Sequence, residues 1–356
     1  MARIVSALSG GVDSAVATAR MLDDGHEVMA VHLVLHGAAT DVDGARDVAR
    51  WLGVPFEVWD LRDEFQREVL DGFVAQYAEG MTPNPCAMCN RAIKFGELMR
   101  RAVARGFDGL VTGHYARVLR VGDGAVELHR AVDVAKDQSY VLGVLTQECL
   151  RRVWLPLGAS SKSEVRKEAA ERGLPVASKS ESMDLCFIPD GDTGGWLRQR
   201  LGARSGEIVD EDGEVLGRHD GVYRYTVGQR RGLNLRRPAS DGSPRFVVGL
   251  DAAAGLVVVG PRSRLEVTGL RGSDAVWTSG VAPGEPLEAM VQVRAHGEEY
   301  AAEVVAVEPG GGLEVRLHSP IVGVAPGQMV VVYDGTKVVA SARIDRTVRA
   351  AEASQM

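Results

Sequence analysis

The chain has 356 residues, of which 45% are hydrophobic and 25% charged, and its formal net charge is −7. This composition is typical of a soluble globular protein with room for two or three domains. No apolar run approaches the ~20 residues needed to cross a bilayer, and no signal peptide precedes the first predicted strand. We therefore expect a cytoplasmic protein with no membrane partner. The acidic balance argues against broad, unspecific nucleic-acid binding but allows a local basic surface.

Strands and helices alternate through the first third of the chain. The expected strands are Arg3–Leu8, Glu27–Leu35, Phe56–Asp60 and Gly109–Thr112, and the expected helices are Ala15–Asp23, Asp43–Leu52, Phe65–Gly80 and Ala92–Arg105. This order predicts an α/β fold with a doubly wound parallel sheet and helices on both faces. Ligands of such sheets bind beyond the carboxyl ends of the strands. A hairpin over Val118–Ala131 and helices over Gln138–Leu150 and Lys162–Arg172 should follow.

The first strand leads directly into the turn Ser9-Gly10-Gly11-Val12-Asp13-Ser14. A glycine turn that opens a helix directs several backbone N–H groups to one point, and the helix dipole reinforces them. The pocket suits a phosphate, but the lysine of the G-x-x-x-x-G-K-[ST] loop is missing. The turn instead resembles the pyrophosphate loop of ATPases that adenylate a substrate. The alternative is an ordinary strand-to-helix turn capped by Ser9 or Asp13.

From about Trp196 the helical pattern fades, and turns rich in Gly and Asp separate short strands. The expected strands are Ile208–Asp210, Phe246–Leu250 and Leu256–Val259, and then Val276–Thr278, Leu287–Val293, Glu303–Glu308, Leu313–Leu317, Met329–Tyr333 and Val338–Ile344. The last group predicts a small antiparallel β-barrel. We therefore expect three domains, over residues 1–196, 197–264 and 265–350. The middle one is rich in arginine and net positive within an acidic chain.

Four cysteines in a chain of this length do not suggest a disulfide scaffold. Cys86 and Cys89 form a C-x-x-C pair among prolines, and we expect the helix to begin only after Cys89. Thiols at a helix start, close to Arg91 and Lys94, should have a lowered pKa. Cys186 lies in a short apolar piece that resembles a strand.

Spacing alone leaves the roles of Cys86, Cys89 and Cys186 open. They could form half of a zinc site, hold an iron–sulfur cluster with one open iron position, or act as a redox pair in which one cysteine carries a sulfane sulfur. Simple packing is a further alternative. Cys149, near the end of a helical stretch, is interpreted as a packing residue.

A series of short motifs occurs along nearly the whole chain. They are Ala7–Ser14, Thr82-Pro83-Asn84-Pro85, Cys89-Asn90, Ile93-Lys94-Phe95, Thr112–Arg117, Lys136–Tyr140, Cys186-Phe187-Ile188, Tyr225–Leu233 and Pro326-Gly327-Gln328. In this order they resemble the tRNA-specific 2-thiouridylases. The resemblance implies a pyrophosphatase-type ATPase domain (adenine nucleotide alpha-hydrolase-like), a small central domain and a β-barrel that together embrace tRNA.

The resemblance also implies a reaction, the synthesis of 2-thiouridine in tRNA for Lys, Glu and Gln. The wobble uridine leaves the anticodon stack and enters the ATPase pocket. Its C2 oxygen attacks the α-phosphate of ATP, which is bound with Mg²⁺, and pyrophosphate departs. A persulfide on Cys186, loaded by a cysteine desulfurase or a relay protein, supplies the sulfur. Cys89 acts as the nucleophile and closes a disulfide with Cys186 or releases sulfide.

Further site residues follow from the matched motifs. ATP contacts are implied for Ala7, Leu8, Ser9, Gly10, Gly11, Val12, Asp13, Ser14, Leu33 and Gly113, and tRNA contacts for His114, Lys136, Asp137, Gln138 and Gln328. One position departs from the family: many members have Asp three residues before the nucleophile, where this chain has Cys86. A third thiol strengthens the iron–sulfur alternative, although persulfide chemistry stays the main interpretation.

Two other classes of function compete with the thiouridylase reading. A small-molecule ligase of the same ATPase superfamily would need an ammonia source, and the sequence contains no glutaminase motif. A non-enzymatic RNA-binding protein would leave the glycine turn and the three thiols unexplained. Pyrophosphate release that depends on tRNA would support only the thiouridylase.

Overall fold

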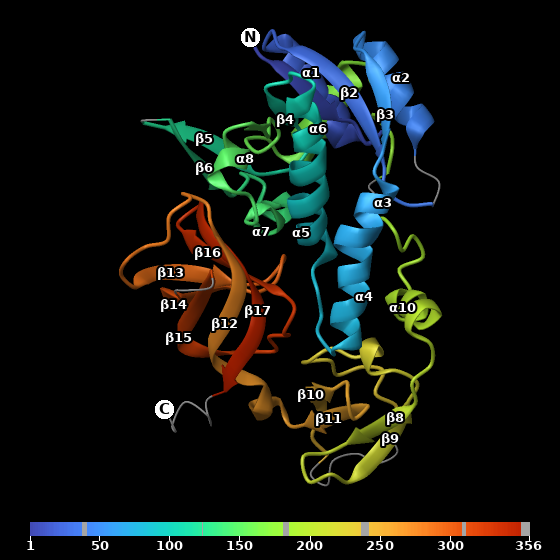
Figure 1. Ribbon diagram of the computed structural model, residues 1–356, viewed down its shortest axis with the longest axis vertical. Helices are drawn as coiled ribbons and strands as arrows, with labels where there is room; N and C mark the ends of the chain where they lie inside the picture. Colours follow the sequence, from blue (N-terminus) through green and yellow to red (C-terminus); the bar gives the residue numbers. More distant parts are fainter. Residues whose placement is uncertain (38–40, 123, 181–184, 236–241, 308–310, 350–356) are drawn as a thin grey trace.

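The computed structural model describes residues 1–37, 41–122, 124–180, 185–235, 242–307 and 311–349 (Figure 1). Three β-sheets dominate it: a parallel sheet near the N-terminus, a small sheet in the middle of the chain and a barrel near the C-terminus. Residues 350–356, at the C-terminus, lie outside the described part of the chain.

The N-terminal sheet has five parallel strands in the order β3–β2–β1–β4–β7. They are β1 (Arg3–Ala7), β2 (Glu27–Val34), β3 (Phe56–Asp60), β4 (Gly109–Val111) and β7 (Val153–Trp154). Helices α1 (Val12–Asp23), α2 (Val42–Leu52) and α9 (Lys162–Glu171) pack on one face, and α6 (Leu98–Ala104) packs on the other. Ile4 and Val5 of β1 belong to different hydrophobic clusters because successive side chains face opposite sides of the sheet. The predicted fold class is confirmed.

Local sequence signals explain several helix ends. Ser161 and Glu164 form a reciprocal capping box at the start of α9. Asp41 caps α2 through the N–H of Gly44, and Gly53, with a φ of 69°, ends it in the left-handed conformation.

A pair of long helical segments extends from the N-terminal sheet toward the middle sheet (Figure 1). The first comprises α3 (Arg62–Phe65), the π-helical turn η1 (Gln66–Leu70) and α4 (Asp71–Ala78); the second comprises α5 (Pro85–Cys89), the π-helix η2 (Asn90–Glu97) and α6. The expectation that the second helix starts after Cys89 is wrong. Pro85 occupies the first helical position, where its fixed φ and missing N–H cost nothing, and the side chain of Asn84 accepts from Ala87 N–H.

Two further expectations also need correction. The stretch Gln138–Leu150 is not one helix but two short ones, α7 (Ser139–Leu142) and α8 (Gln147–Leu150), because Thr146 caps a new helix. The piece around Cys186 is a turn rather than a strand, and its first residues lie outside the described part of the chain.

The middle region forms a four-stranded sheet in the order β10–β11–β8–β9, next to helix α10 (Thr193–Leu201). Its strands are β8 (Gly206–Val209), β9 (Val215–His219), β10 (Phe246–Asp251) and β11 (Leu256–Gly260). Short 3₁₀ turns lie at η3 (Val134–Lys136), η4 (Val222–Arg224) and η5 (Arg262–Leu265).

The C-terminal region closes into an antiparallel barrel, as predicted. Its strands are β12 (Glu266–Trp277), β13 (Leu287–Gln292), β14 (Glu299–Val307), β15 (Gly312–Val322), β16 (Met329–Asp334) and β17 (Lys337–Arg349), and β12 pairs with β17 to complete the ring. The hairpin of β5 (Arg117–Val121) and β6 (Ala125–His129) joins β17. Barrel residues Met329, Val331 and Tyr333 share one hydrophobic cluster with the N-terminal sheet, so the two regions are packed against each other.

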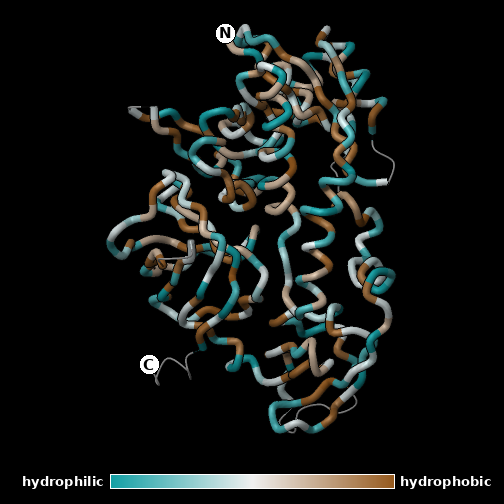
Figure 2. The backbone as a smooth tube through the Cα atoms, viewed as in Figure 1, coloured by the Kyte–Doolittle hydropathy of each residue, from teal (hydrophilic) through white to brown (hydrophobic). Residues whose placement is uncertain are grey.

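Hydrophobic and hydrophilic residues alternate along the chain without a long apolar stretch (Figure 2). Among the described residues, no helix has the length and apolar character needed to cross a membrane.

Candidate active site

Two loops meet at the carboxyl ends of the neighbouring strands β1 and β4. β1 pairs with β2 on one side and with β4 on the other, and both pairings are parallel. The strand order therefore reverses at this point, which is where doubly wound sheets bind their ligands. The turn Ser9–Ser14 follows β1, and Thr112–His114 follows β4.

Glycines let these backbones approach closely. A β-carbon at Gly113 would lie 2.7 Å from the backbone nitrogen of Ser14 and 2.8 Å from the carbonyl carbon of Asp13. A β-carbon at Gly10, whose φ is +79°, would lie 2.8 Å from a carboxylate oxygen of Asp41. A larger residue at Gly113 would push the two loops apart, whereas one at Gly10, besides adopting a strained φ, would collide with Asp41 at the start of α2.

The first turn is held by hydroxyl groups rather than by a helix cap. Ser14 Oγ lies 3.0 Å from Ser9 Oγ, accepts from the N–H of Ser9 and donates to the carbonyl of Gly11. Gly11 is the N-cap of α1, and no side chain caps this end within the described residues. The alternative, an ordinary strand-to-helix turn capped by the side chain of Ser9 or Asp13, is therefore not observed. The N–H groups of the first helical turn are left for a ligand, as in an anion site.

Two adjoining cavities surround the turn. The inner pocket, of about 370 Å³, is lined by Ala7, Leu8, Ser9, Asp13, Ser14, Val31, His32, Leu33, Leu35, Lys94, Thr112, Gly113, His114 and Gln138. The outer cleft, of about 670 Å³, is lined by Ser9, Gly11, Val12, Asp13, His32, Leu33, Leu35, His36, Asp41, Tyr115, Lys136, Gln138, Lys162, Arg166, Lys179, Ser180, Leu185, Cys186 and Pro189. All residues expected to contact ATP line one of these two cavities, except Gly10. Gly10 is part of the turn but lines neither cavity.

Among the described residues, four cations line the outer cleft, and only Lys136 was expected from the motifs to be a site residue. Lys162 Nζ donates to both carboxylate oxygens of Asp13, at 2.6 and 2.7 Å, and Tyr115 Oη donates to the same carboxylate at 2.8 Å. Lys162 is the first residue of α9, so the capping box at Ser161 was a usable signal for its position. The Asp13 carboxylate is thus occupied by a cation of this chain.

Lys179 connects the turn to the segment that leads to Cys186. Its ammonium donates to the carbonyl of Gly10 at 2.8 Å and to the carboxylate of Asp41. With Arg166, Lys136 and Lys162 on the same cleft, this end of the site suits a strongly anionic ligand.

His32 is a buried pocket residue that sequence reasoning missed. Its Nδ1 lies 3.0 Å from the carbonyl of Leu8, whereas its Nε2 has no hydrogen-bond partner among the described residues. Burial lowers the pKa of His32, so the ring is neutral at pH 7. The bond to Leu8 places the proton on Nδ1 and leaves Nε2 as an acceptor in the pocket.

The thiol of Cys89 does not have the lowered pKa that its position near a helix start predicted. Burial raises the pKa of Cys89 to about 11, and it also raises that of Cys186; Lys94 opposes the shift at both. Cys89 is 7% exposed, while Cys86 and Cys186 are exposed. The position near a helix start was expected to lower the thiol pKa, but the removal of the sulfur from water raises that pKa by more. All four cysteines lie in described parts of the chain, and none of them is in a disulfide.

Aromatic packing brings Cys186 toward Cys89. Phe187 lies edge-on to Phe65 and Phe73, with ring centroids 5.9 and 5.4 Å apart, in the hydrophobic cluster that also contains Cys89. Ionisation of Cys186 or Cys86 would raise the pKa of Cys89 further, which shows that the three thiols lie within electrostatic reach of one another. Cys149 instead packs against the core of the N-terminal sheet, as expected.

The geometry offers little support for a metal centre. In the described residues, no three His, Cys, Asp or Glu side chains converge closely enough to hold a metal ion, and this applies to Cys86, Cys89 and Cys186. The three thiols therefore do not fit an iron–sulfur cluster in this arrangement.

Family comparisons agree with the three sheets. A tRNA methyl transferase HUP domain model matches residues 2–190, a tRNA methyl transferase PRC-barrel domain model matches residues 194–261, and an aminomethyltransferase beta-barrel domain model matches residues 267–344. The chain is 52% identical over 367 residues to the tRNA-specific 2-thiouridylase MnmA of Nocardioides sp., covering 98% of this chain and 99% of the relative.

Two further relatives carry the same name. The protein of Acidothermus cellulolyticus is 52% identical over 365 residues, 99% of this chain and 100% of its own, and that of Kineococcus radiotolerans is 53% identical over 361 residues, 97% and 99%. The chain belongs to the tRNA-specific 2-thiouridylase family. This confirms the resemblance inferred from the motifs.

Within this thiouridylase fold, the residues expected to contact tRNA have different environments. His114 is 8% exposed at the end of the inner pocket, and burial lowers its pKa well below the usual value. Gln138 spans both cavities and accepts from Tyr115 N–H. Asp137 already accepts from Ala131 N–H, Arg130 and the hydroxyl of Ser139, so its carboxylate has a structural role.

In the thiouridylase fold, Gln328 links the barrel to the loop that precedes α5, the helix that carries Cys86 and Cys89. Its amide donates to the carbonyl of Thr82 at 2.9 Å, and Thr82 N–H donates to the carbonyl of Pro326 at 2.8 Å. A β-carbon at Gly327 would lie 2.8 Å from Thr82 N. Gln328 therefore fixes the loop just before Asn84 and Cys86.

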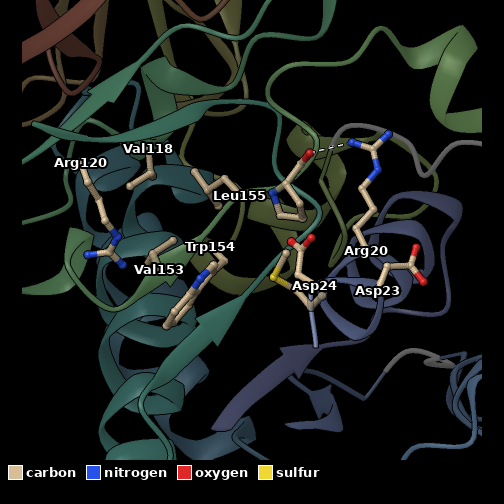
Figure 3. Close-up of a pocket in the computed structure, with 10 residues that line it drawn as sticks. Arg20, Asp23, Asp24, Val118, Arg120, Val153, Trp154 and Leu155 are labelled. Carbon is tan, nitrogen blue, oxygen red and sulfur yellow. Dashed lines mark hydrogen bonds between the residues drawn. The ribbon is translucent and has the colours of Figure 1, made fainter. Parts of the chain in front are cut away.

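A third cavity lies apart from these residues (Figure 3). It lies between the C-terminal end of α1 and the strand β7, and Arg20 spans one side by donating to the carbonyl of Pro156 at 2.7 Å. Neither the glycine turn nor a thiol lines it. We therefore place the candidate site at the inner pocket and the outer cleft.

Proposed function

We propose that the protein is a tRNA-uridine 2-sulfurtransferase, which replaces the C2 oxygen of a wobble uridine with sulfur at the expense of ATP. One observation carries this proposal: the same outer cleft is lined by the glycine turn with its cations and by Cys186. Such a cleft can activate a carbonyl and present a sulfur nucleophile to it. The two thiols have no evident use in a methyl transferase, the term in the family models' names.

In the activation step, the triphosphate of ATP, entering as its Mg²⁺ complex, lies against the N–H groups of Gly11–Ser14, with Lys162 and Lys179 beside it. The adenine occupies the inner pocket against Leu33 and Gly113. The uridine O2 attacks the α-phosphorus, the bond to the β-phosphate breaks, and pyrophosphate leaves. Donors already in place offset the charge that develops on pyrophosphate. The base loses its N3 proton and becomes an O-adenylated base with a good leaving group at C2.

In the sulfur step, the terminal sulfur of a Cys186 persulfide attacks C2, and AMP leaves with the former O2. The thiolate of Cys89 then attacks the Cys186 sulfur, and the sulfur–sulfur bond to the base breaks. The base leaves as the thiouridine anion and takes a proton from water at N3, so the products are 2-thiouridine and a Cys89–Cys186 disulfide. The sulfane sulfur has gained two electrons and the two cysteines have lost them, so an external dithiol must reduce the disulfide before the next cycle.

The proposed partners follow from this cycle. They are tRNA for Lys, Glu and Gln, contacted by His114, Lys136, Gln138 and Gln328, and a cysteine desulfurase or relay protein that loads Cys186. A partly exposed Cys186 supports such loading. Asp137 is a weaker candidate for a tRNA contact, because its carboxylate already accepts a hydrogen bond from Ala131 N–H. The proposed compartment is the cytoplasm.

Pyrophosphate release, measured with and without tRNA, tests the activation step. We expect release only with tRNA, and mass spectrometry of the tRNA nucleosides should then find 2-thiouridine when a persulfide donor is added. Cys186→Ser should abolish thiolation and leave tRNA binding nearly unchanged. Equal release without tRNA would instead favour a small-molecule ligase and would contradict the proposal.

A further inference from the structure

Lys94 is a cation of the inner pocket without a carboxylate partner. It lines the pocket together with Leu33, Gly113 and His114 and is partly buried. Within the described parts of the chain, its ammonium makes neither a hydrogen bond nor an ion pair. The nearest acidic residue in the sequence, Glu97, forms ion pairs with other cations instead.

The pairing of Glu97 explains this isolation. Glu97 accepts from Arg100 at 2.6 and 2.8 Å and from Arg101 at 2.6 Å, so both of its oxygens are engaged by arginines. A lysine that is partly removed from water and lacks a counter-charge is costly to maintain. Such a residue is suited to an anion that arrives during the reaction.

The π-helical geometry of η2 places Lys94 close to Cys89. Hydrogen bonds in a π-helix join residues five apart, so Lys94 lies almost above Cys89, the residue that precedes η2. In an α-helix, five residues cover about 1.4 turns, which would direct the two side chains to different sides. Departures of this kind from α-helix are frequent at functional sites.

The charge of Lys94 acts on both thiols. It favours the thiolate forms of Cys89 and Cys186, opposing the effect of burial at each. It also disfavours the charged form of His114, which is neutral beside Thr112. Lys94 is thus the cation that faces both sulfurs from the side of the nucleotide pocket.

We propose that Lys94 is the positioning residue of sulfur transfer: its ammonium holds the anionic sulfur of Cys186, and then that of Cys89, beside C2 of the activated base. This inference rests on the proposed function. Lys94 forms and breaks no covalent bond and keeps its proton. The negative charge passes from the persulfide to departing AMP and then from Cys89 to the new thiouridine, and Lys94 stabilises it on sulfur before each attack.

The first test follows thiol ionisation in the intact chain. Iodoacetamide labelling rates are measured from pH 6 to 9, below the titration of Cys89, and peptide mass spectrometry reports Cys89 and Cys186 separately. Because only the thiolate reacts, we expect Lys94→Met to lower both rates about tenfold at each pH, the equivalent of about one pH unit, while Lys94→Arg leaves them in place. Lys167→Met removes a lysine that is 76% exposed and should change nothing. Cys86 and the cations Lys136, Lys162, Arg166 and Lys179 face the same region and are unchanged in all these proteins.

The second test separates the two half-reactions. In Lys94→Met, the amount of 2-thiouridine formed per pyrophosphate released should fall at least about tenfold, and Lys94→Arg should restore most of that ratio. Labelling rates equal to those of the wild type, or a loss of pyrophosphate release equal to the loss of 2-thiouridine, would overturn the role assigned to Lys94; the latter would make it a nucleotide ligand. If the wild type itself releases no pyrophosphate with tRNA, the proposed function fails, whereas the labelling result does not depend on tRNA.

Discussion

Lys162 Nζ lies 2.6 Å from Oδ1 of Asp13, which is 149 residues away in the sequence. The pair links the first residue of α9 to the glycine turn after β1, and Tyr115 completes it from the second loop. Three separate segments therefore converge on one carboxylate beside the cations of the outer cleft.

Removal of this cation should impair activation of the substrate. Lys162→Met is expected to lower tRNA-dependent pyrophosphate release by about 100-fold, the usual cost of losing one preorganised charge. Stability should fall by only about 1 kcal/mol, because Asp13 is 34% exposed and stays partly solvated. Lys167→Met, on the exposed side of the same helix, serves as the control. Wild-type rates of pyrophosphate release in Lys162→Met would mean that the triphosphate binds elsewhere.

Contact between the two loops predicts a strong effect of one methyl group. Gly113→Ala places a carbon 2.7 Å from Ser14 N, and the resulting displacement should cost about 1–3 kcal/mol and weaken ATP binding at least about tenfold. Isothermal titration with a non-hydrolysable ATP analogue measures the second effect. Gly122→Ala, with no atom within 4 Å of the added carbon, should match the wild type in both assays. Normal ATP affinity in Gly113→Ala would show that the loops need not touch.

The buried thiol of Cys89 predicts that stability declines in alkali. Its pKa is about 11 in the folded chain, above the usual value, so the folded state holds the proton more tightly than the unfolded state. The contribution is complete below about pH 9 and falls as the pH rises through 11, by about 2–3 kcal/mol in all. Urea unfolding at pH 8 and at pH 11 measures the loss. Cys89→Ala should remove this part of the pH dependence, and Cys86→Ala, which changes an exposed thiol, should retain most of it; identical losses in all three proteins would refute the assignment.

The bond between the barrel and the loop before Cys86 predicts an effect over a long distance. Gln328→Leu removes the donor to Thr82, at a cost of about 1 kcal/mol in stability. A loosened loop should reduce thiolation by about tenfold, because small displacements of reacting groups cost much in rate. Cys186 labelling, which does not depend on this loop, provides the control. Undiminished 2-thiouridine formation would show that the remaining bond from Thr82 N–H to Pro326 suffices.

Much of the N-terminal architecture was predictable because the signals are local. Continuous apolar strands such as Glu27–Val34 and the capped helix Lys162–Glu171 have periods and end residues that can be read directly. The start of α5 differs from the prediction because Pro85 is at the first helical position, where proline is favoured, and not in a helix interior, where it breaks the helix. The single helix expected over 138–150 is divided because the side chain of Thr146 caps a new helix.

The protonation states and ion-pair partners of the site residues were harder to predict than the identity of those residues. Residues of the glycine turn, Leu33, Gly113 and Cys186 line the two adjoining cavities, and their roles there stay predictions. Lys162, Lys179, His32 and the unpaired state of Lys94 carry no motif of their own. Their importance depends on which neighbours surround them.

By itself, the sequence determined the α/β sheet, the barrel, the glycine turn and membership of the thiouridylase family, because each depends on periodicity or on adjacent residues. Only the tertiary structure decided the ionisation of the thiols and the partners of the cations. The physical reason is that the pKa of Cys89 depends on burial by residues such as Phe187, nearly a hundred positions away. Likewise, the charge balance around Asp13 depends on a helix that the chain reaches only after completing the sheet.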